Sequence, residues 1–333
     1  MSDPFQVNVE RPPAKRLSIF NHKGGVGKTT LTFNIASAIA SLGKRVLLVD
    51  SDPQCNLTAQ LIDDEVLDDL LDNSDGSGGS TIWSAVKPIV EMAGTFKKIP
   101  AINIRRNLYL LPGDIQLSDF ETDLNDFWRE CFQRKRRGFI GTTALSALVD
   151  MVCRVENIDF VFYDGGPNIG PLNRVILLDC DYFIVPVAYD LFSVRALKTL
   201  GRTLHTWISD WITIAGLAPD DSATMPGKPM FLGYVPQNFT VYRGGVASQQ
   251  ARYMALIENG VQTNIVGVLR DLDVAPRKKS YRLGEIKNFG SLVAASQREG
   301  TPLYLSSKGS ASQKAAARKE FLSLASTIIK RTA

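Results

Sequence analysis

Eight residues near the start of this chain, 23–30, constrain its fold more than any other segment. They read KGGVGKTT, follow an apolar run that ends at Phe20, and precede a helical pattern. A glycine-rich turn between a strand and a helix lets consecutive backbone N–H groups converge on phosphate oxygens, and the helix dipole adds positive charge there. In such a loop Lys28 would contact the β and γ phosphates of a nucleotide, and the Thr29 hydroxyl would hold Mg²⁺.

The loop departs from the usual GxxxxGK[ST] pattern. His22 occupies the position of the first glycine, and a second lysine, Lys23, opens the loop. With these features the sequence resembles the deviant Walker A family, the ParA/MinD ATPases, whose signature is KGGxGK[ST]. A plain glycine-rich turn with two solvated lysines is the alternative, but two lysines, three glycines and two threonines in this order favour phosphate binding. The expected nucleotide-binding residues are Lys23, Gly24, Gly25, Val26, Gly27, Lys28, Thr29 and Thr30.

Apolar strand-like runs alternate with helical periodicity, which predicts an α/β fold with a mainly parallel, doubly wound sheet and helices on both faces. With the loop, this is the P-loop NTPase architecture. The predicted strands are 17–21, 45–50, 107–111, 160–164, 182–187, 230–235, 265–269 and, more weakly, 302–305. The predicted helices are 29–42, 142–155, 194–214, 245–258, 290–298 and 311–329.

The length of 333 residues is long for one domain, but open α/β sheets often grow through insertions at loops. We expect an N-terminal extension over 1–15 and a single domain over 16–333. Compared with a minimal member of the family that it resembles, the domain has longer segments near 62–80, 118–141 and 207–228.

The four cysteines form no CxxC pair, which argues against a zinc site, an iron–sulfur cluster or a disulfide framework. No run reaches the roughly 18 apolar residues of a membrane span. The first 15 residues lack the apolar core of a signal peptide. These observations predict a cytoplasmic protein.

Acidic side chains follow two of the predicted strands. Residues 50–54 read DSDPQ, and Asp50 and Asp52 point the same way if the chain is still extended. The strand 160–164 ends in Asp164, which is a Walker B placement for a carboxylate acting on Mg²⁺. Each carboxylate alone could be a structural cap or turn residue. Together with the loop, in this chain order, they indicate a nucleotide and metal site in which Thr29, Asp50 and Asp164 serve the metal.

The resemblance extends from about residue 16 to about residue 329. One departure is clear, because the family usually has DxPP after Walker B whereas this chain has Asp164, two glycines and Pro167. Extra backbone freedom at Gly166 could alter how this segment responds to the γ phosphate. The segments that resemble family motifs are 50–56 (DSDPQCN), 107–113 (NLYLLPG), 184–187 (IVPV), 275–277 (APR) and 299–302 (EGTP).

The resemblance implies an ATPase that forms a homodimer around two ATP molecules, slow without a stimulating partner. Lys28, Thr29 and Asp164 would act within one subunit, and Lys23 would reach the partner's phosphate, as an arginine finger does. Asp52 would orient the attacking water, and Asp50 would support the outer shell of the metal. The catalytic residues would therefore be Lys23, Lys28 and Asp52.

Basic side chains suggest what such a switch controls. Arg195, Lys198 and Arg202 share one helix face, and residues 134–137 read RKRR. A DNA backbone is bound by several such cations without a base-reading motif, although solubilising charge explains each cluster equally well. The favoured hypothesis is a nucleoid-associated, ParA-like partition ATPase with non-specific DNA and a ParB-like stimulating protein as partners.

Two other functions stay open. A MinD-like membrane-cycling ATPase would need a terminal amphipathic helix, and the apolar stripe within 321–329 could supply one. A helix docked on the core explains this stripe better, so a membrane partner is not expected. The third alternative is a weakly hydrolytic, nucleotide-gated scaffold for another cargo.

Overall fold

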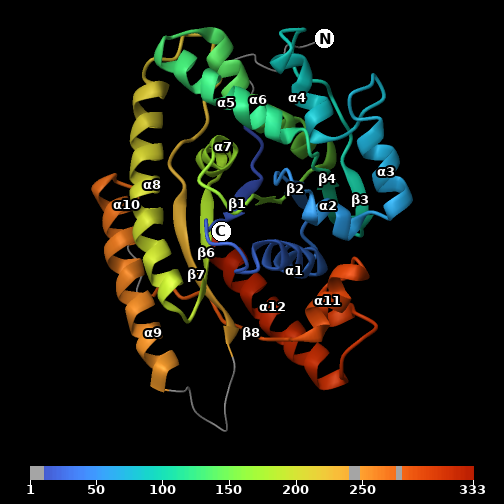
Figure 1. The fold of residues 1–333 in the computed structure, drawn as a ribbon, viewed down its shortest axis with the longest axis vertical. Coiled ribbons are helices and arrows are strands. Elements are labelled where there is room, and N and C mark those ends of the chain that lie inside the picture. Colours follow the sequence, from blue (N-terminus) through green and yellow to red (C-terminus); the bar gives the residue numbers. More distant parts are fainter. Residues whose placement is uncertain (1–10, 240–247, 275–279) are drawn as a thin grey trace.

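The computed structural model describes residues 11–239, 248–274 and 280–333. Within these residues one eight-stranded sheet runs through the molecule in the order β3-β4-β2-β5-β1-β6-β7-β8 (Figure 1). All neighbouring strands are parallel except β3 and β4, which are antiparallel. The strands are β1 (Lys15–Ile19), β2 (Val46–Asp50), β3 (Ile102–Arg105), β4 (Leu108–Leu111), β5 (Phe160–Asp164), β6 (Tyr182–Ala188), β7 (Met230–Phe239) and β8 (Ile286–Lys287).

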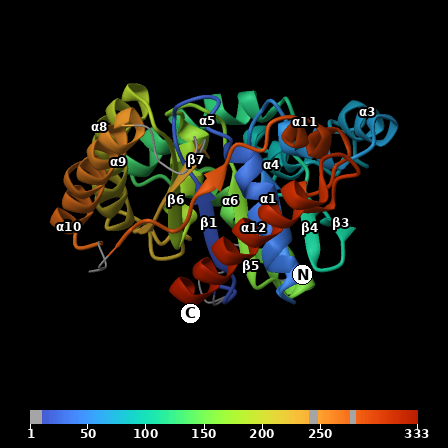
Figure 2. The ribbon, with the colours of Figure 1, turned by 90° about the horizontal axis from the view of Figure 1, so that it is seen from below.

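Helices cover both faces of the sheet, as predicted, and successive residues of a strand face different cores. In β2, Val46 and Leu48 pack toward α1 (Lys28–Ser41), α11 (Ser291–Arg298) and α12 (Ala311–Thr332), which lie on one face. Leu47 and Val49 pack toward the opposite face. Because both faces are covered, the central strands are nearly continuous apolar runs, which is why the sequence revealed them. Figure 2 shows α1 and α12 side by side in front of the sheet. The opposite face carries α4 (Ile82–Val90), α5 (Leu117–Phe132), α6 (Arg136–Glu156), α7 (Pro171–Asp179) and α8 (Leu191–Ala215).

Two predicted strands are wrong. Residues 265–269 lie in a π-helical turn (Val261–Val266) and α10 (Gly267–Asp271), which continue α9 (Ser248–Gly260). The buried residues of this stretch recur at helical spacing, and a short apolar run does not distinguish this pattern from a strand. Residues 302–305 contain a 3₁₀ turn, η2 (Leu303–Leu305), in place of a strand. Of the predicted helix 245–258, residues 245–247 lie outside the described residues, as do residues 275–277 of the APR motif.

The segments expected to be insertions contain regular structure. Residues 62–80 include α3 (Asp64–Asp72), which follows α2 (Asn56–Leu61), and residues 207–228 include the end of α8. Residues 118–141 form most of α5 and the start of α6, and Phe120, Leu124 and Phe127 of α5 are buried in the core. Among the described helices α6 alone has the length and hydropathy of a membrane span, and 61% of that stretch is buried inside the molecule.

A buried ion network stabilises the end of the sheet opposite the phosphate loop. The guanidinium of Arg16 at the start of β1 is fully buried, and its Nη1 lies 2.6 Å from Asp179 Oδ2. It also pairs with Asp150, while the Tyr163 hydroxyl donates to Asp179. Arg11 lies 3.5 Å from Asp179 and Arg154 lies 3.8 Å from Asp150, but both of these arginines are partly exposed. Removing Arg16 would therefore leave the two carboxylates without their buried cation.

Candidate nucleotide-binding site

The predicted phosphate loop connects β1 to α1, and its shape depends on glycine. Gly25 and Gly27 adopt φ values of +71° and +70°, in the left-handed region that favours glycine. A Cβ at Gly27 would lie 2.7 Å from the side-chain oxygen of Gln237 on β7. Gln237 also donates a hydrogen bond to the carbonyl of Val26. The N-terminus of α1 has no side-chain cap, so its N–H groups are available to an anion.

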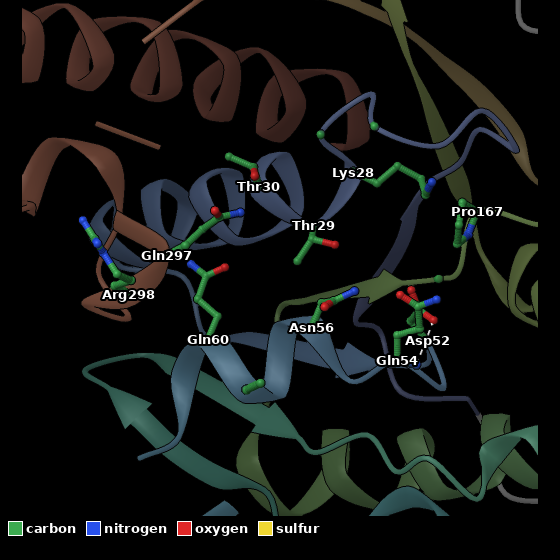
Figure 3. Close-up of a pocket in the computed structure, with 14 residues that line it drawn as sticks. Lys28, Thr29, Thr30, Asp52, Gln54, Asn56, Gln60, Pro167, Gln297 and Arg298 are labelled. Atoms are coloured by element: carbon green, nitrogen blue, oxygen red, sulfur yellow. Dashed lines mark hydrogen bonds between the residues drawn. The ribbon is translucent and has the colours of Figure 1, made fainter. Parts of the chain in front are cut away.

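A cavity of about 590 Å³ opens beside this loop. Figure 3 shows Lys28, Asp52 and Pro167 toward one end of the cavity and Gln60, Gln297 and Arg298 toward the other. The predicted residues that line it are Gly25, Gly27, Lys28, Thr29, Thr30 and Asp52. The sequence prediction did not include Gln54, Asn56, Ala59, Gln60, Gly165, Pro167, Gln297 and Arg298, which complete the lining.

The three predicted carboxylates lie together behind the loop. Asp50 and Asp164 are register partners at the ends of β2 and β5. The pKa of Asp164 is raised to about 8, mainly by burial. The charges of Asp50 and Asp52 contribute to this rise, whereas the Thr29 hydroxyl and Lys28 oppose it. Burial also raises the pKa of Asp50 to about 6, although Thr58 donates two hydrogen bonds to it. The side chain of Asp52 is nearly buried, and its Oδ1 accepts from the Gln54 N–H at 3.0 Å.

These residues fit a divalent cation. Lys28 opposes the charges of Asp52 and Asp164 at the cavity, and a further positive charge would also stabilise the ionised carboxylates. Thr29 and Asp164 would hold Mg²⁺ as expected. The Oδ2 of Asp50 accepts from the Thr58 N–H at 2.7 Å and the Thr58 hydroxyl at 2.6 Å, which suits a supporting role. No group of three His, Cys, Asp or Glu side chains in the described part of the chain forms a ready metal centre, so phosphate oxygens would complete the coordination.

Lys23 lies apart from the cavity. Its Nζ is 2.5 Å from Asp190 Oδ2 and 3.3 Å from the Ser193 hydroxyl. Asp190 is also the N-cap of α8, where its Oδ1 accepts from the Ser193 N–H at 2.7 Å. The next two residues, Leu191 and Phe192, are 44% and 67% exposed. The second lysine of the motif therefore ties the phosphate loop to the start of α8.

The loop after β5 uses its two glycines differently. A Cβ at Gly165 would lie 2.2 Å from the Asn173 side-chain oxygen, whereas one at Gly166 would make ordinary contact with Asp52 at 3.4 Å. The Asn173 amide donates to the carbonyls of Gly166 and Asn168, both at 3.0 Å. Gly166 does not adopt positive φ, so the freedom expected of it is not used in this conformation.

A parallel sheet with a phosphate loop between its central strand and a helix, and an aspartate at the end of the adjacent strand, defines a P-loop nucleotide-binding protein. Residues 14–212 match the family model described as an AAA domain (AAA_31). The chain belongs to the ParA-like family of P-loop ATPases.

Two relatives support this assignment, and a solved structure shares the fold. The sporulation initiation inhibitor protein Soj of Bacillus subtilis is 31% identical over 57% of this chain and 65% of its own length. The chromosome partitioning protein ParA of Caulobacter vibrioides is 29% identical over 58% of this chain and 63% of its own. The chain thus spans less than two thirds of the length of these relatives. The crystal structure of protein DIP2308 from Corynebacterium diphtheriae, at 26% identity, covers 95% of this chain and 98% of its own, with a TM-score of 0.69.

Proposed function

We propose that this chain is an ATP-dependent dimerising switch that hydrolyses ATP, binds DNA without sequence preference, and segregates or positions plasmid or chromosomal DNA. The observation that carries the proposal is the position of Lys23. A P-loop cation that lines no part of its own cavity, and lies next to exposed apolar side chains, is suited to serve the phosphate of another subunit.

Within one subunit, the loop residues would bind the phosphates. Lys28 and the free N–H groups at the start of α1 would stabilise negative charge on the phosphate oxygens. Mg²⁺, when bound through Thr29 and Asp164, would neutralise further phosphate charge. The carboxylate of Asp52 lines the cavity and would orient the attacking water and accept its proton.

The dimer would bring two phosphate loops face to face. Lys23 would leave Asp190 and contact the partner's nucleotide, so ATP would join the two subunits. Leu191 and Phe192 support this arrangement, because large apolar side chains next to Lys23 would gain from burial between subunits.

The row of cations on α8 is the stronger DNA candidate of the two basic clusters. Arg195, Lys198 and Arg202 are exposed, and none has an ion-pair partner within the residues that the structure describes. In the other cluster, Arg137 lies 2.8 Å from Glu130 and Arg136 lies 3.9 Å from Asp221. A cation without an ion-pair partner has no existing ion pair to break when it binds a DNA phosphate.

Features of this chain and its relatives distinguish the candidate functions. The chromosome partitioning role printed for the Caulobacter relative supports DNA as cargo. A ParB-like stimulating protein and a cytoplasmic, nucleoid-associated location are part of the same proposal. In α12, Phe321, Leu324 and Ile328 are buried, which supports a docked helix over a MinD-like membrane anchor. Phosphate release near zero with DNA present would favour the nucleotide-gated scaffold.

Dimerisation of the Lys23→Ala variant tests the proposal. Light scattering should detect an ATP-dependent dimer of the unaltered chain and a monomer of the variant, while nucleotide titration finds ATP still bound to the variant. Lys44→Ala, which changes a partly exposed lysine in the turn after α1, should dimerise normally. An equally strong dimer of Lys23→Ala would refute the role in trans. A shift of arbitrary duplex DNA that requires ATP and weakens with salt would support DNA binding.

A further inference from the structure

A second cavity, of about 340 Å³, lies at the far end of α1 from the phosphate loop. It is formed by the last turns of α1, the end of β3, η2 and α12. Ser37 in its wall follows Lys28 by nine residues, which places it roughly 14 Å along the helix axis. Its lining includes Ser37, Arg105, Arg106, Tyr304, Arg318 and Leu322.

Three arginines converge on this cavity without a carboxylate. Neither Asp nor Glu lines it, and Arg105, Arg106 and Arg318 have no ion-pair partner in the described ranges. Three neighbouring guanidinium groups repel one another, so their arrangement gains stability when an anion joins them. Arginine is also the side chain whose planar donors best match phosphate oxygens.

Arg105 is held in place by contacts that leave donors unused. Its Nη2 donates to the Gly300 carbonyl at 2.6 Å, and its guanidinium carbon lies 5.6 Å from the centre of the Phe33 ring. Its Nε is buried and has no hydrogen-bond partner. The hydroxyl of Ser37, which is 4% exposed, is likewise unpartnered. Buried donors without partners are costly, and a ligand oxygen would satisfy them.

We propose that this cavity binds a small organic phosphate. The arginines would hold the phosphate, and Tyr304 and Leu322 would contact the organic part. The volume is at the lower end of the range for small-molecule pockets. A recess that reaches the buried Ser37 suits a compact ligand better than the convex backbone of a DNA duplex.

One segment, residues 297–305, contributes lining residues to both cavities. Gln297 and Arg298 line the first cavity, and Gly300 holds Arg105 of the second. The buried Asn34 of α1 links the same segment to the phosphate loop: its Oδ1 accepts from the Leu303 N–H at 2.9 Å, and its Nδ2 donates to the Thr30 carbonyl at 2.8 Å. A ligand in the second cavity would therefore change nucleotide affinity, and nucleotide would change its affinity by the same factor.

Calorimetric titration with phenyl phosphate tests the binding site. Phenyl phosphate can also enter the first cavity, so the titration is repeated in the Lys28→Gln variant, and the component that remains belongs to the second cavity. That component should weaken at least about tenfold in Arg318→Gln and in Arg105→Gln. Arg318 is exposed, so its replacement leaves the fold intact. Arg270→Gln, which changes an exposed arginine on α10, should bind within about twofold of the unaltered chain.

Several results would overturn the proposal. These are no remaining component at millimolar phenyl phosphate, equal affinity in all the arginine variants, or equal binding of phenol, which lacks the phosphate. A short DNA duplex that binds through Arg318 while phenyl phosphate does not bind would reassign the site to nucleic acid. For the coupling, the ADP dissociation constant should change by about fivefold when phenyl phosphate is saturating, and an unchanged constant would refute it. None of these outcomes depends on whether the chain dimerises.

Discussion

The ion pair between Lys23 and Asp190 should oppose the proposed ATP-dependent dimer, because Lys23 must leave Asp190 to reach a partner. The Asp190→Asn variant removes this charge. Asparagine is as good an N-cap as aspartate, so α8 should keep its start. The variant thus removes the ion pair with Lys23 and keeps the N-cap role of residue 190.

The size of the effect follows from the exposure of the pair. The two side chains are 23% and 38% exposed, which places the pair near the upper end of surface ion pairs, at about 0.5–1 kcal/mol. Each dimer requires two such pairs to break, so the variant should favour the dimer by about 1–2 kcal/mol. This corresponds to a dimer dissociation constant lower by roughly 5-fold to 30-fold.

Analytical ultracentrifugation with ATP, over a range of protein concentrations, measures this constant. The gap between the variant and the unaltered chain should narrow as salt is added, since salt screens the pair that the variant lacks. Asp126→Asn, which removes an exposed ion pair with Arg129 on α5, serves as the control. An unchanged or weaker dimer of Asp190→Asn would refute the reasoning, because Asp190 would then impose no restraint or would itself contact the partner.

Three further predictions follow from the site and the core. Asp52→Ala should still bind ATP and dimerise but hydrolyse it about 100-fold more slowly or worse, as measured by phosphate release; normal turnover would exclude Asp52 as the water-orienting group. Arg16→Met should lower the free energy of unfolding by about 3–5 kcal/mol in urea titrations, because Asp150 and Asp179 lose their buried cation; a loss below about 1 kcal/mol would contradict this. The pKa of Asp164 is about 8 in the folded chain against 3.8 ordinarily, so between these values the folded state holds a proton that the unfolded state has lost. The free energy of unfolding of the nucleotide-free chain should therefore fall as pH rises from about 4 to about 8, and Asp164→Asn should flatten this slope.

The central strands could be predicted because burial on both faces leaves a simple apolar signal. The strand 160–164 agrees with β5 at both ends. By contrast, β3 is an edge strand of four residues, none of them buried, and β8 has only two residues, so neither produces such a run. Residues 265–269 were predicted as a strand because a short apolar run is compatible with both a buried helix and a buried strand.

The phosphate end of the site was predictable because its chemistry requires particular residues in a short segment. The other end is lined by Gln60 of α2 and by Gln297 and Arg298 of α11, which are more than 230 residues apart in sequence. Nothing local marks such residues, since only the folded chain brings them together. The DSDPQCN motif did contain Gln54 and Asn56, and their place after a strand end was the signal that could have identified them.

The contact between Gln237 and the phosphate loop limits how the chain can be shortened. The family model ends at residue 212, which invites truncation there. A fragment that ends there would lack the Gln237 side-chain amide that donates to the Val26 carbonyl. It would also lack the strands β7 and β8 and the face of α12 that covers α1. It would keep every residue of the KGGVGKTT signature, but the apolar side chains that β7 and α12 cover would be exposed to water. We expect such a fragment to aggregate, so the phosphate loop and the last third of the polypeptide form a single folding unit.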